Sequence, residues 1–292
     1  MLPKEFYVKQ IKHKLNDYWQ LIKSLQTGLL LATGLSGYMT VRCPVFNLPE
    51  LSAVAATLFL AISGSTVLNM WHDRDIDAKM KRTCLRPLAT GKVQPGEALW
   101  VGIVLSVSGV LWSFVINPLY GTIVFAGLFF DFFVYTIWLK RRTCWAIIWG
   151  GISGGMPVLA GRTLALGQID WIGLALAVAI LFWIPTHIMT FSIRYDQDYR
   201  LAKIPTFVSK FNVAFTRKVI AISSILAGLM MGLAALGIGL QFGYLRLLVV
   251  LSAGLVLLSL RSMINPSEKL NFGLFKYASL YMLSSMILMM VR

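Results

Sequence analysis

Residues 52–71 read SAVAATLFLAISGSTVLNMW, a run without a single charged side chain, and residues 72–77 continue as HDRDID. An α-helix rises about 1.5 Å per residue, so a run of this length spans the roughly 30 Å hydrocarbon core of a bilayer. The chain then changes abruptly from apolar residues to a segment rich in carboxylates. This stretch predicts a membrane-spanning helix that ends in an acidic loop.

The composition of the whole chain extends this prediction. Of its 292 residues, 57% are hydrophobic and 13% are charged, whereas about 25% of the residues in an average soluble domain are charged. Apolar runs of spanning length fall at 25–42, 52–71, 99–116, 119–138, 146–165, 171–191, 219–240, 244–261 and 272–291. We therefore expect an all-α integral membrane bundle of about nine transmembrane helices, with residues 1–292 forming a single domain.

The positive charges predict the orientation of this bundle. The 27 lysine and arginine residues give a net charge of +15 and gather in short groups between alternate apolar runs. Membrane proteins carry an excess of such residues in their cytoplasmic loops. We expect a cell-membrane protein in which the N-terminal segment 1–24 and the loops after the second, fourth, sixth and eighth spans are cytoplasmic. A nucleic-acid-binding protein would gather these charges on one soluble face, so nucleic acid is not an expected partner.

The few acidic residues are concentrated in two loops on the predicted cytoplasmic side. Asn69, Asp73 and Asp77 lie four residues apart, a spacing that keeps side chains on one face of a helix. Amide and carboxylate oxygens are the hard ligands that Mg²⁺ prefers, together with phosphate oxygens of a substrate. The second loop, residues 194–203, again mixes carboxylates with basic residues.

Two interpretations of these loops compete. Carboxylates beside lysine and arginine are commonly solvated charges that pair with their neighbours. However, only twelve acidic residues occur in the chain, and five of them lie in these two loops among cations suited to a diphosphate. This concentration favours a metal and polyanion site at the cytoplasmic end of the bundle.

The spacing of Asn69, Asp73 and Asp77 resembles the first aspartate-rich motif of the UbiA superfamily of intramembrane prenyltransferases. Within that superfamily, the likeness is to the protoheme IX farnesyltransferase (heme O synthase) branch and runs from about residue 60 to 210. It rests on residues 69–88, which include Arg82-Thr83 and Arg86-Pro87-Leu88, on YTIWLKRRT at 135–143, and on Pro185, His187, Asp198-Tyr199 and Ile204-Pro205. The resemblance implies a UbiA-like helical fold.

It also implies a reaction, in which a farnesyl group passes from farnesyl diphosphate to a vinyl group of heme B. The implied cofactor is Mg²⁺, held by Asn69, Asp73, Asp77 and Asp198, which with His187 form the implied catalytic set. His187 would ligate heme iron or move a proton. The implied substrate-binding residues are Arg82, Arg86, Tyr135, Lys140, Arg141, Asp196 and Lys203. Asp196 stands in for an acid that the family often has four residues before Asp198, where this chain has Arg194.

Several alternatives stay open on the sequence. The acceptor can instead be an aromatic quinone precursor or a glycerol phosphate lipid, and an oxidase-assembly protein is a candidate partner. Asp131, inside the fourth span, can serve a polar group of the acceptor or pair with a cation of a neighbouring helix. A transporter would carry its acidic residues near the bilayer midplane, whereas most acids here cluster at one membrane face.

Overall fold

The structure is a computed structural model that describes residues 4–43 and 47–290. Within these ranges the chain forms helices and no strands. The long helices are α1 (Lys4–Leu21), α2 (Ser24–Arg42), α3 (Leu48–His72), α5 (Pro95–Ile116), α6 (Pro118–Leu128) with its continuation η1 (Phe129–Leu139), α7 (Ala146–Leu166), α8 (Trp171–Arg194), α11 (Val213–Ile238), α12 (Phe242–Ile264) and α13 (Glu268–Met290). All but α1 correspond to the nine predicted spans, so the predicted all-α bundle is confirmed.

These helices have the lengths and compositions of membrane spans. Over the described ranges, seven are long and apolar enough to cross a membrane: α3, α5, α6 with η1, α8, α11, α12 and α13. The other two, α2 and α7, have 19 and 21 residues and are richer in glycine. The chain therefore has the architecture of a multi-pass membrane protein.

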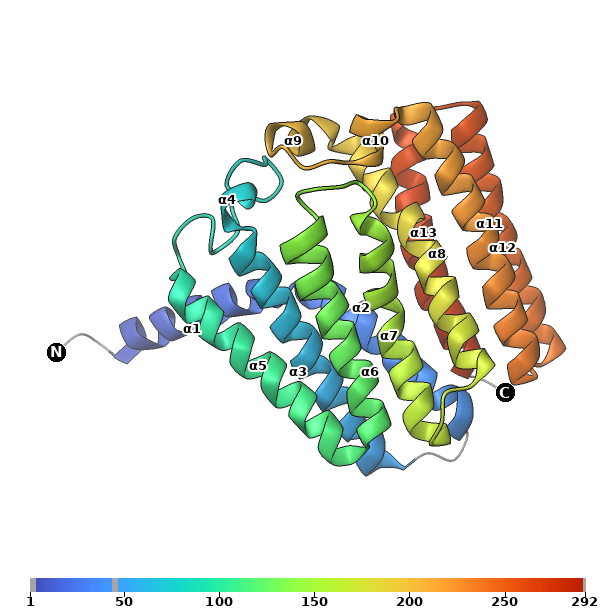
Figure 1. The fold of residues 1–292 in the computed structure, drawn as a ribbon, viewed down its shortest axis with the longest axis horizontal. Helices are drawn as coiled ribbons and strands as arrows, with labels where there is room; N and C mark the ends of the chain where they lie inside the picture. The colour runs from blue at the N-terminus through green and yellow to red at the C-terminus, as the bar shows by residue number, and fades with distance from the viewer. Residues whose placement is uncertain (1–3, 44–46, 291–292) are drawn as a thin grey trace.

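The loops with the acidic residues meet at one end of the bundle. Three short helices, α4 (Arg74–Asp77), α9 (Asp196–Leu201) and α10 (Phe207–Lys210), lie there, at the top of Figure 1. Hydrogen bonds join the 73–94 loop to the 140–145 loop and to α9. We call this region the acidic-loop end. The prediction that these loops share one side of the bundle is confirmed.

Helix α2 crosses behind the other helices in Figure 1 and packs closely against α7. Glycines allow this close approach, because a Cβ atom on Gly161 would collide with the Gly34 carbonyl, and one on Gly37 would collide with the Val158 carbonyl. Small residues at helix contacts are how membrane helices gain van der Waals contact without a hydrophobic driving force. The glycines therefore position α2 against α7.

A buried ion pair holds the opposite end of the bundle. Arg162, in the last turn of α7, is 4% exposed and donates from Nε and Nη2 to Asp170 at 2.9 and 2.8 Å. Its Nη1 donates to Thr40 of α2 at 2.7 Å. Asp170 also accepts from the Gly173 N–H and so caps α8. A buried charge is tolerated where it is paired and hydrogen-bonded, so Arg162 ties α2, α7 and α8 together.

Halfway along the fourth span, the chain changes from an α-helix to a π-helix. Residues Phe129–Leu139 form a π-helix, with a bond from the Lys140 N–H to the Tyr135 carbonyl at 2.8 Å. Residues five apart therefore lie much closer to one face than they do in an α-helix. The sequence predicted an apolar span here but not a π-helix. Such helices are rare and frequently occur at functional sites.

We expect Gly161→Ala to lower the thermal unfolding midpoint of the detergent-solubilised protein. The added methyl group meets the α2 backbone, and overpacking of this kind costs roughly 1–3 kcal/mol. Gly232→Ala in α11 is the matched control, because a Cβ atom there has no neighbour within 4 Å in the part of the chain that the structure describes. This control should leave the midpoint unchanged or raise it, since alanine favours a helix by about 1 kcal/mol over glycine. Equal midpoints for both variants would contradict the packing role of Gly161.

Candidate functional site

The first acidic segment lies where α3 ends and α4 begins. Asp73 sits at the junction with φ −90° and ψ 6°. Its N–H donates to the Asn69 carbonyl at 3.0 Å, and the Asp77 N–H donates to the Asp73 carbonyl at 2.8 Å. Helical stepping by four thus continues through the junction, as the spacing of these three residues predicted.

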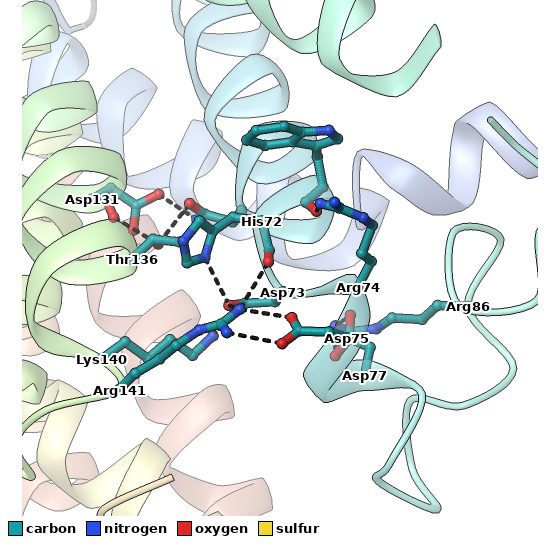
Figure 2. Close-up of polar contacts among 12 residues, drawn as sticks. His72, Asp73, Arg74, Asp75, Asp77, Arg86, Asp131, Thr136, Lys140 and Arg141 are labelled. Atoms are coloured by element: carbon teal, nitrogen blue, oxygen red, sulfur yellow. Dashed lines mark hydrogen bonds and ion pairs between the residues drawn. The ribbon is translucent and has the colours of Figure 1, made fainter. Parts of the chain in front are cut away.

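Asp73 is buried at this junction and surrounded by cations (Figure 2). It forms an ion pair with Lys140, which follows η1, and lies 3.3 Å from His72 Nδ1 and 3.8 Å from Arg141 Nη2. Burial raises the pKa of Asp73, but Lys140 and His72 together hold it well below its usual range. Burial lowers the pKa of Lys140, but Tyr135 and Asp73 raise it overall. Both partners are therefore charged.

The other two aspartates of this segment also carry a cation each. Arg86 Nη1 lies 2.8 and 2.7 Å from the two carboxylate oxygens of Asp77, which is buried. Arg141 makes a two-pronged contact with the exposed Asp75, at 2.9 and 2.7 Å (Figure 2). Arg86, Lys140 and Arg141 were all predicted to bind a substrate diphosphate. In this structure they form ion pairs with the aspartates of this segment.

An apolar contact brings the second acidic loop to the first. Ile76 and Met80 are buried against Ile204, with Tyr199 packed beside them. This contact places Asp198, which is 7% exposed, close enough to accept a hydrogen bond from the Arg82 backbone N–H at 3.3 Å. The two loops that were predicted to form one site therefore meet.

The remaining predicted residues of the second loop lie around Asp198. Asp196 accepts from Arg200 Nε at 2.8 Å through Oδ2, while its buried Oδ1 has no hydrogen-bond partner in the described ranges. Lys203 is exposed at a turn with φ 56°. The Arg82 guanidinium lies over the rings of Phe191 and Tyr195, 4.7 and 5.8 Å from their centroids. Such stacking holds a cation in place and leaves its outer edge available.

His187 lies among aromatic side chains between α8 and α13. Its ring stacks on Trp183 and Phe275 with centroid distances of 4.8 and 4.6 Å, and its Nδ1 lies 3.2 Å from the Ser279 hydroxyl. These ring contacts are with helix residues and not with the acidic loops. His187 therefore lies in an aromatic environment formed by α8 and α13.

Asp131 is hydrogen-bonded to side chains of α3. Asp131 Oδ2 accepts from the Ser65 hydroxyl at 2.5 Å and from Asn69 Nδ2 at 2.8 Å, and Thr136 Oγ1 lies 2.7 Å from Asn69 Oδ1. Asp131 and Thr136 are five residues apart, so the π-helix turns both toward α3. Asp131 therefore contacts a predicted metal ligand instead of a cation. Only a five-residue period in the sequence would have indicated this contact.

Tyr135 neighbours the same ion pair, because Lys140 Nζ lies 5.6 Å from the centre of its ring. The residue is half-buried at the end of η1. Its ring faces α7 at Gly150, where a Cβ atom would come within 3.4 Å. The predicted cation-binding aromatic residue is thus next to the predicted diphosphate-binding residues.

Lys23 is a site residue that the sequence did not single out. It precedes α2 in the left-handed conformation, with φ 45° and ψ 62°, and with Arg86 it lines a pocket of about 400 Å³. Burial and the nearby charges of Arg86 and Lys140 lower the pKa of Lys23 to about 7. Backbone strain of this kind is concentrated at functional sites. Its only signal in the sequence was a basic residue just before the first span.

The donor chemistry of the site fits Mg²⁺, although the ligands do not form a closed cage. In the described part of the chain, no three histidine, cysteine or acidic side chains converge as a metal cluster. Mg²⁺ commonly needs only one or two carboxylates besides waters and substrate phosphates. Asp198, although buried, receives a single hydrogen bond among the described residues, and Asp196 Oδ1 receives none. Buried carboxylate oxygens in this condition favour a bound cation.

Comparisons with known proteins agree with this fold. The UbiA prenyltransferase family matches residues 30–280. A digeranylgeranylglyceryl phosphate synthase structure superposes with a TM-score of 0.79 at 17% identity, covering 95% of this chain and 98% of that one. A UbiA homolog from Archaeoglobus fulgidus bound to GPP and Mg²⁺ superposes with a TM-score of 0.69 at 15% identity, covering 94% of this chain and all of that one, 100%. At these identities, the two structures support the fold.

Curated relatives are more similar in sequence. The protoheme IX farnesyltransferase of Archaeoglobus fulgidus is 39% identical over 241 residues, which cover 82% of this chain and 84% of that protein. The protein of the same name from Pyrobaculum islandicum is 33% identical over 266 residues, covering 91% of this chain and 95% of the relative. Together with the helical bundle and its acidic loops, these matches show that the chain belongs to the UbiA prenyltransferase family and is a prenyltransferase.

Proposed function

We propose that this prenyltransferase uses Mg²⁺ to transfer a farnesyl group from farnesyl diphosphate to a vinyl group of heme B, which gives heme O. The observation that carries the proposal is the meeting of two acidic loops, with three basic side chains, at one end of an apolar bundle. That arrangement suits a donor with a charged diphosphate head and a long apolar tail. The relatives named protoheme IX farnesyltransferase support the choice of donor and acceptor.

The structure of the UbiA homolog with GPP and Mg²⁺ supports the metal. Asn69, Asp73, Asp77 and Asp198 would hold the ion, which supplies Lewis-acid stabilisation of the departing diphosphate. Lys140 and Arg86 form ion pairs with Asp73 and Asp77. These two cations would therefore lie next to the ion and would donate to diphosphate oxygens.

The basic side chains then act on the reaction itself. Negative charge grows on the diphosphate as the bond between C1 and oxygen breaks, so cations already in place stabilise the transition state more than the ground state. Arg141, Arg82 and Lys203 would add further positive charge around the diphosphate. The Tyr135 ring next to Lys140 would contact the allylic cation, a contact worth roughly 0.5–2 kcal/mol.

We assign His187 to the acceptor. Its Nδ1 is engaged with Ser279, while no hydrogen bond to its Nε2 occurs within the described ranges, so this nitrogen is available to ligate heme iron or to move a proton. The flanking rings of Trp183 and Phe275 suit a flat aromatic acceptor. We further propose that the protein lies in the cell membrane with the acidic-loop end and residues 1–24 on the cytoplasmic side, as the excess of basic loop residues predicts.

Asp73→Ala should reduce turnover by at least about 100-fold, because it removes a metal ligand and leaves Lys140 unpaired. The assay supplies purified protein in detergent with Mg²⁺, farnesyl diphosphate and heme B, and detects farnesylhydroxyethyl heme by mass spectrometry. EDTA should abolish the product. Asp75→Ala is the matched control, since the Asp75 side chain is 54% exposed, and it should retain most of the activity.

The outcomes separate the parts of the proposal. Diphosphate release with a quinone precursor or glycerol phosphate lipid, but no heme product, would show a different acceptor. Normal turnover by Asp73→Ala would contradict the metal-site assignment.

Binding of a diphosphate should be accompanied by proton uptake at Lys23. The pKa of about 7 leaves this amine mostly neutral at pH 8, and a bound anion raises the pKa toward its usual value and protonates it. Uptake should approach one proton per site at pH 8 and vanish near pH 5.5, where the amine is already charged. Calorimetry in buffers of different ionisation enthalpy measures it. Lys23→Met should abolish the uptake, and uptake that persists in this variant would exclude Lys23 as its source.

A further inference from the structure

We propose that Asp131 and Thr136 position the Asn69 amide for metal binding, so that the π-helical segment acts as part of the metal site without touching the metal. This inference rests on the proposed function, because it assumes that Asn69 is a Mg²⁺ ligand. It concerns a carboxylate inside a membrane span. Such residues are costly in the bilayer and usually serve a function.

The orientation of the Asn69 amide decides which of its atoms faces a metal ion. An asparagine side chain presents oxygen on one side and NH₂ on the other, and only the oxygen binds a metal ion. Asp131 Oδ2 accepts hydrogen bonds from both Ser65 and Asn69 Nδ2. A carboxylate oxygen that accepts in this way selects the nitrogen of the amide. Asp131 therefore prevents the flip that would present NH₂ to the cation.

Thr136 contacts the oxygen side of the same amide. Its side chain is fully buried, and its hydroxyl lies 2.7 Å from Asn69 Oδ1 and 2.9 Å from the Asp131 backbone carbonyl. The hydroxyl has one hydrogen and two acceptors in reach. When a cation takes the amide oxygen, the hydrogen can turn to the Asp131 carbonyl, so that no buried donor is left without a partner.

The π-helical form of η1 brings Asp131 and Thr136 to the same side of the helix. Residues 131 and 136 both reach Asn69 because residues five apart lie on the same side of η1, which spans Phe129–Leu139. In an α-helix they would diverge by about 140° (five steps of 100°). The same segment leads directly into Lys140, the partner of Asp73. The π-helix and the residue that follows it thus contact Asn69 and Asp73, two successive residues of the acidic motif.

The test measures metal binding separately from turnover. The probe is Mg²⁺, titrated at a fixed concentration of farnesyl S-thiolodiphosphate, an unreactive donor analogue, and the readout is the thermal unfolding midpoint in detergent. Asp131→Leu should raise the Mg²⁺ concentration for half-saturation about 10- to 100-fold, the usual effect of losing a group that orients a metal ligand. Its midpoint without ligands is measured as well, because the lost carboxylate leaves the Ser65 and Asn69 donors without this partner and lowers stability independently of Mg²⁺.

Two threonine variants and one control sharpen the result. Thr136→Ser keeps the hydroxyl and should bind Mg²⁺ like the unmodified protein, whereas Thr136→Val should shift half-saturation in the same direction as Asp131→Leu. Ser63→Ala is the matched control on α3, and it should change nothing, because the buried Ser63 hydroxyl has no hydrogen-bond partner among the described residues.

Each outcome has one meaning. Unchanged half-saturation in Asp131→Leu, with or without a lower unliganded midpoint, would overturn the positioning role and leave the proposed function intact. The absence of any Mg²⁺ response in the unmodified protein would overturn the proposed metal site, and the inference with it.

Discussion

The buried ion pair between Asp73 and Lys140 is the interaction on which the rest of the site depends. It joins the end of α3 to the end of η1, and it keeps a carboxylate ionised where burial would otherwise favour its neutral form. A buried pair of this kind contributes little net stability, but removing one partner is costly. Under the proposed function, a metal ion would take the place of Lys140 beside Asp73, and a phosphate would take the place of Asp73 beside Lys140.

The bilayer explains why the chemistry lies at one end of the bundle. Within hydrocarbon the backbone must satisfy its own hydrogen bonds, so the spans are helical and charged groups are displaced to the ends. The acidic-loop end collects both acidic segments and their cations, while the opposite end uses its buried pair, Arg162 and Asp170, to join helices. The two ends thus use the same kind of interaction for different purposes.

The π-helix is where fold and site are joined most directly. Its wider turns bring Asp131 and Thr136 toward Asn69, and the segment leads directly into Lys140. An irregular segment inside a membrane helix is retained where it has a structural or functional role, and here it contacts the predicted metal-binding motif at two points. The Asn69 amide and the Asp73 carboxylate are consequently positioned by one neighbouring segment.

The sequence by itself determined the all-α membrane bundle, its spans and the motif at the end of the second one. Those properties are local, because span length follows from bilayer thickness and helical spacing by four survives from Asn69 to Asp77. Only the tertiary structure revealed the pairing of Asp131 with Asn69, the place of Lys23 beside Arg86, and which cation neutralises which carboxylate. These contacts join segments far apart in the chain. The contact of Asp131 with Asn69 also depends on a π-helix, which the spacing of apolar residues does not indicate.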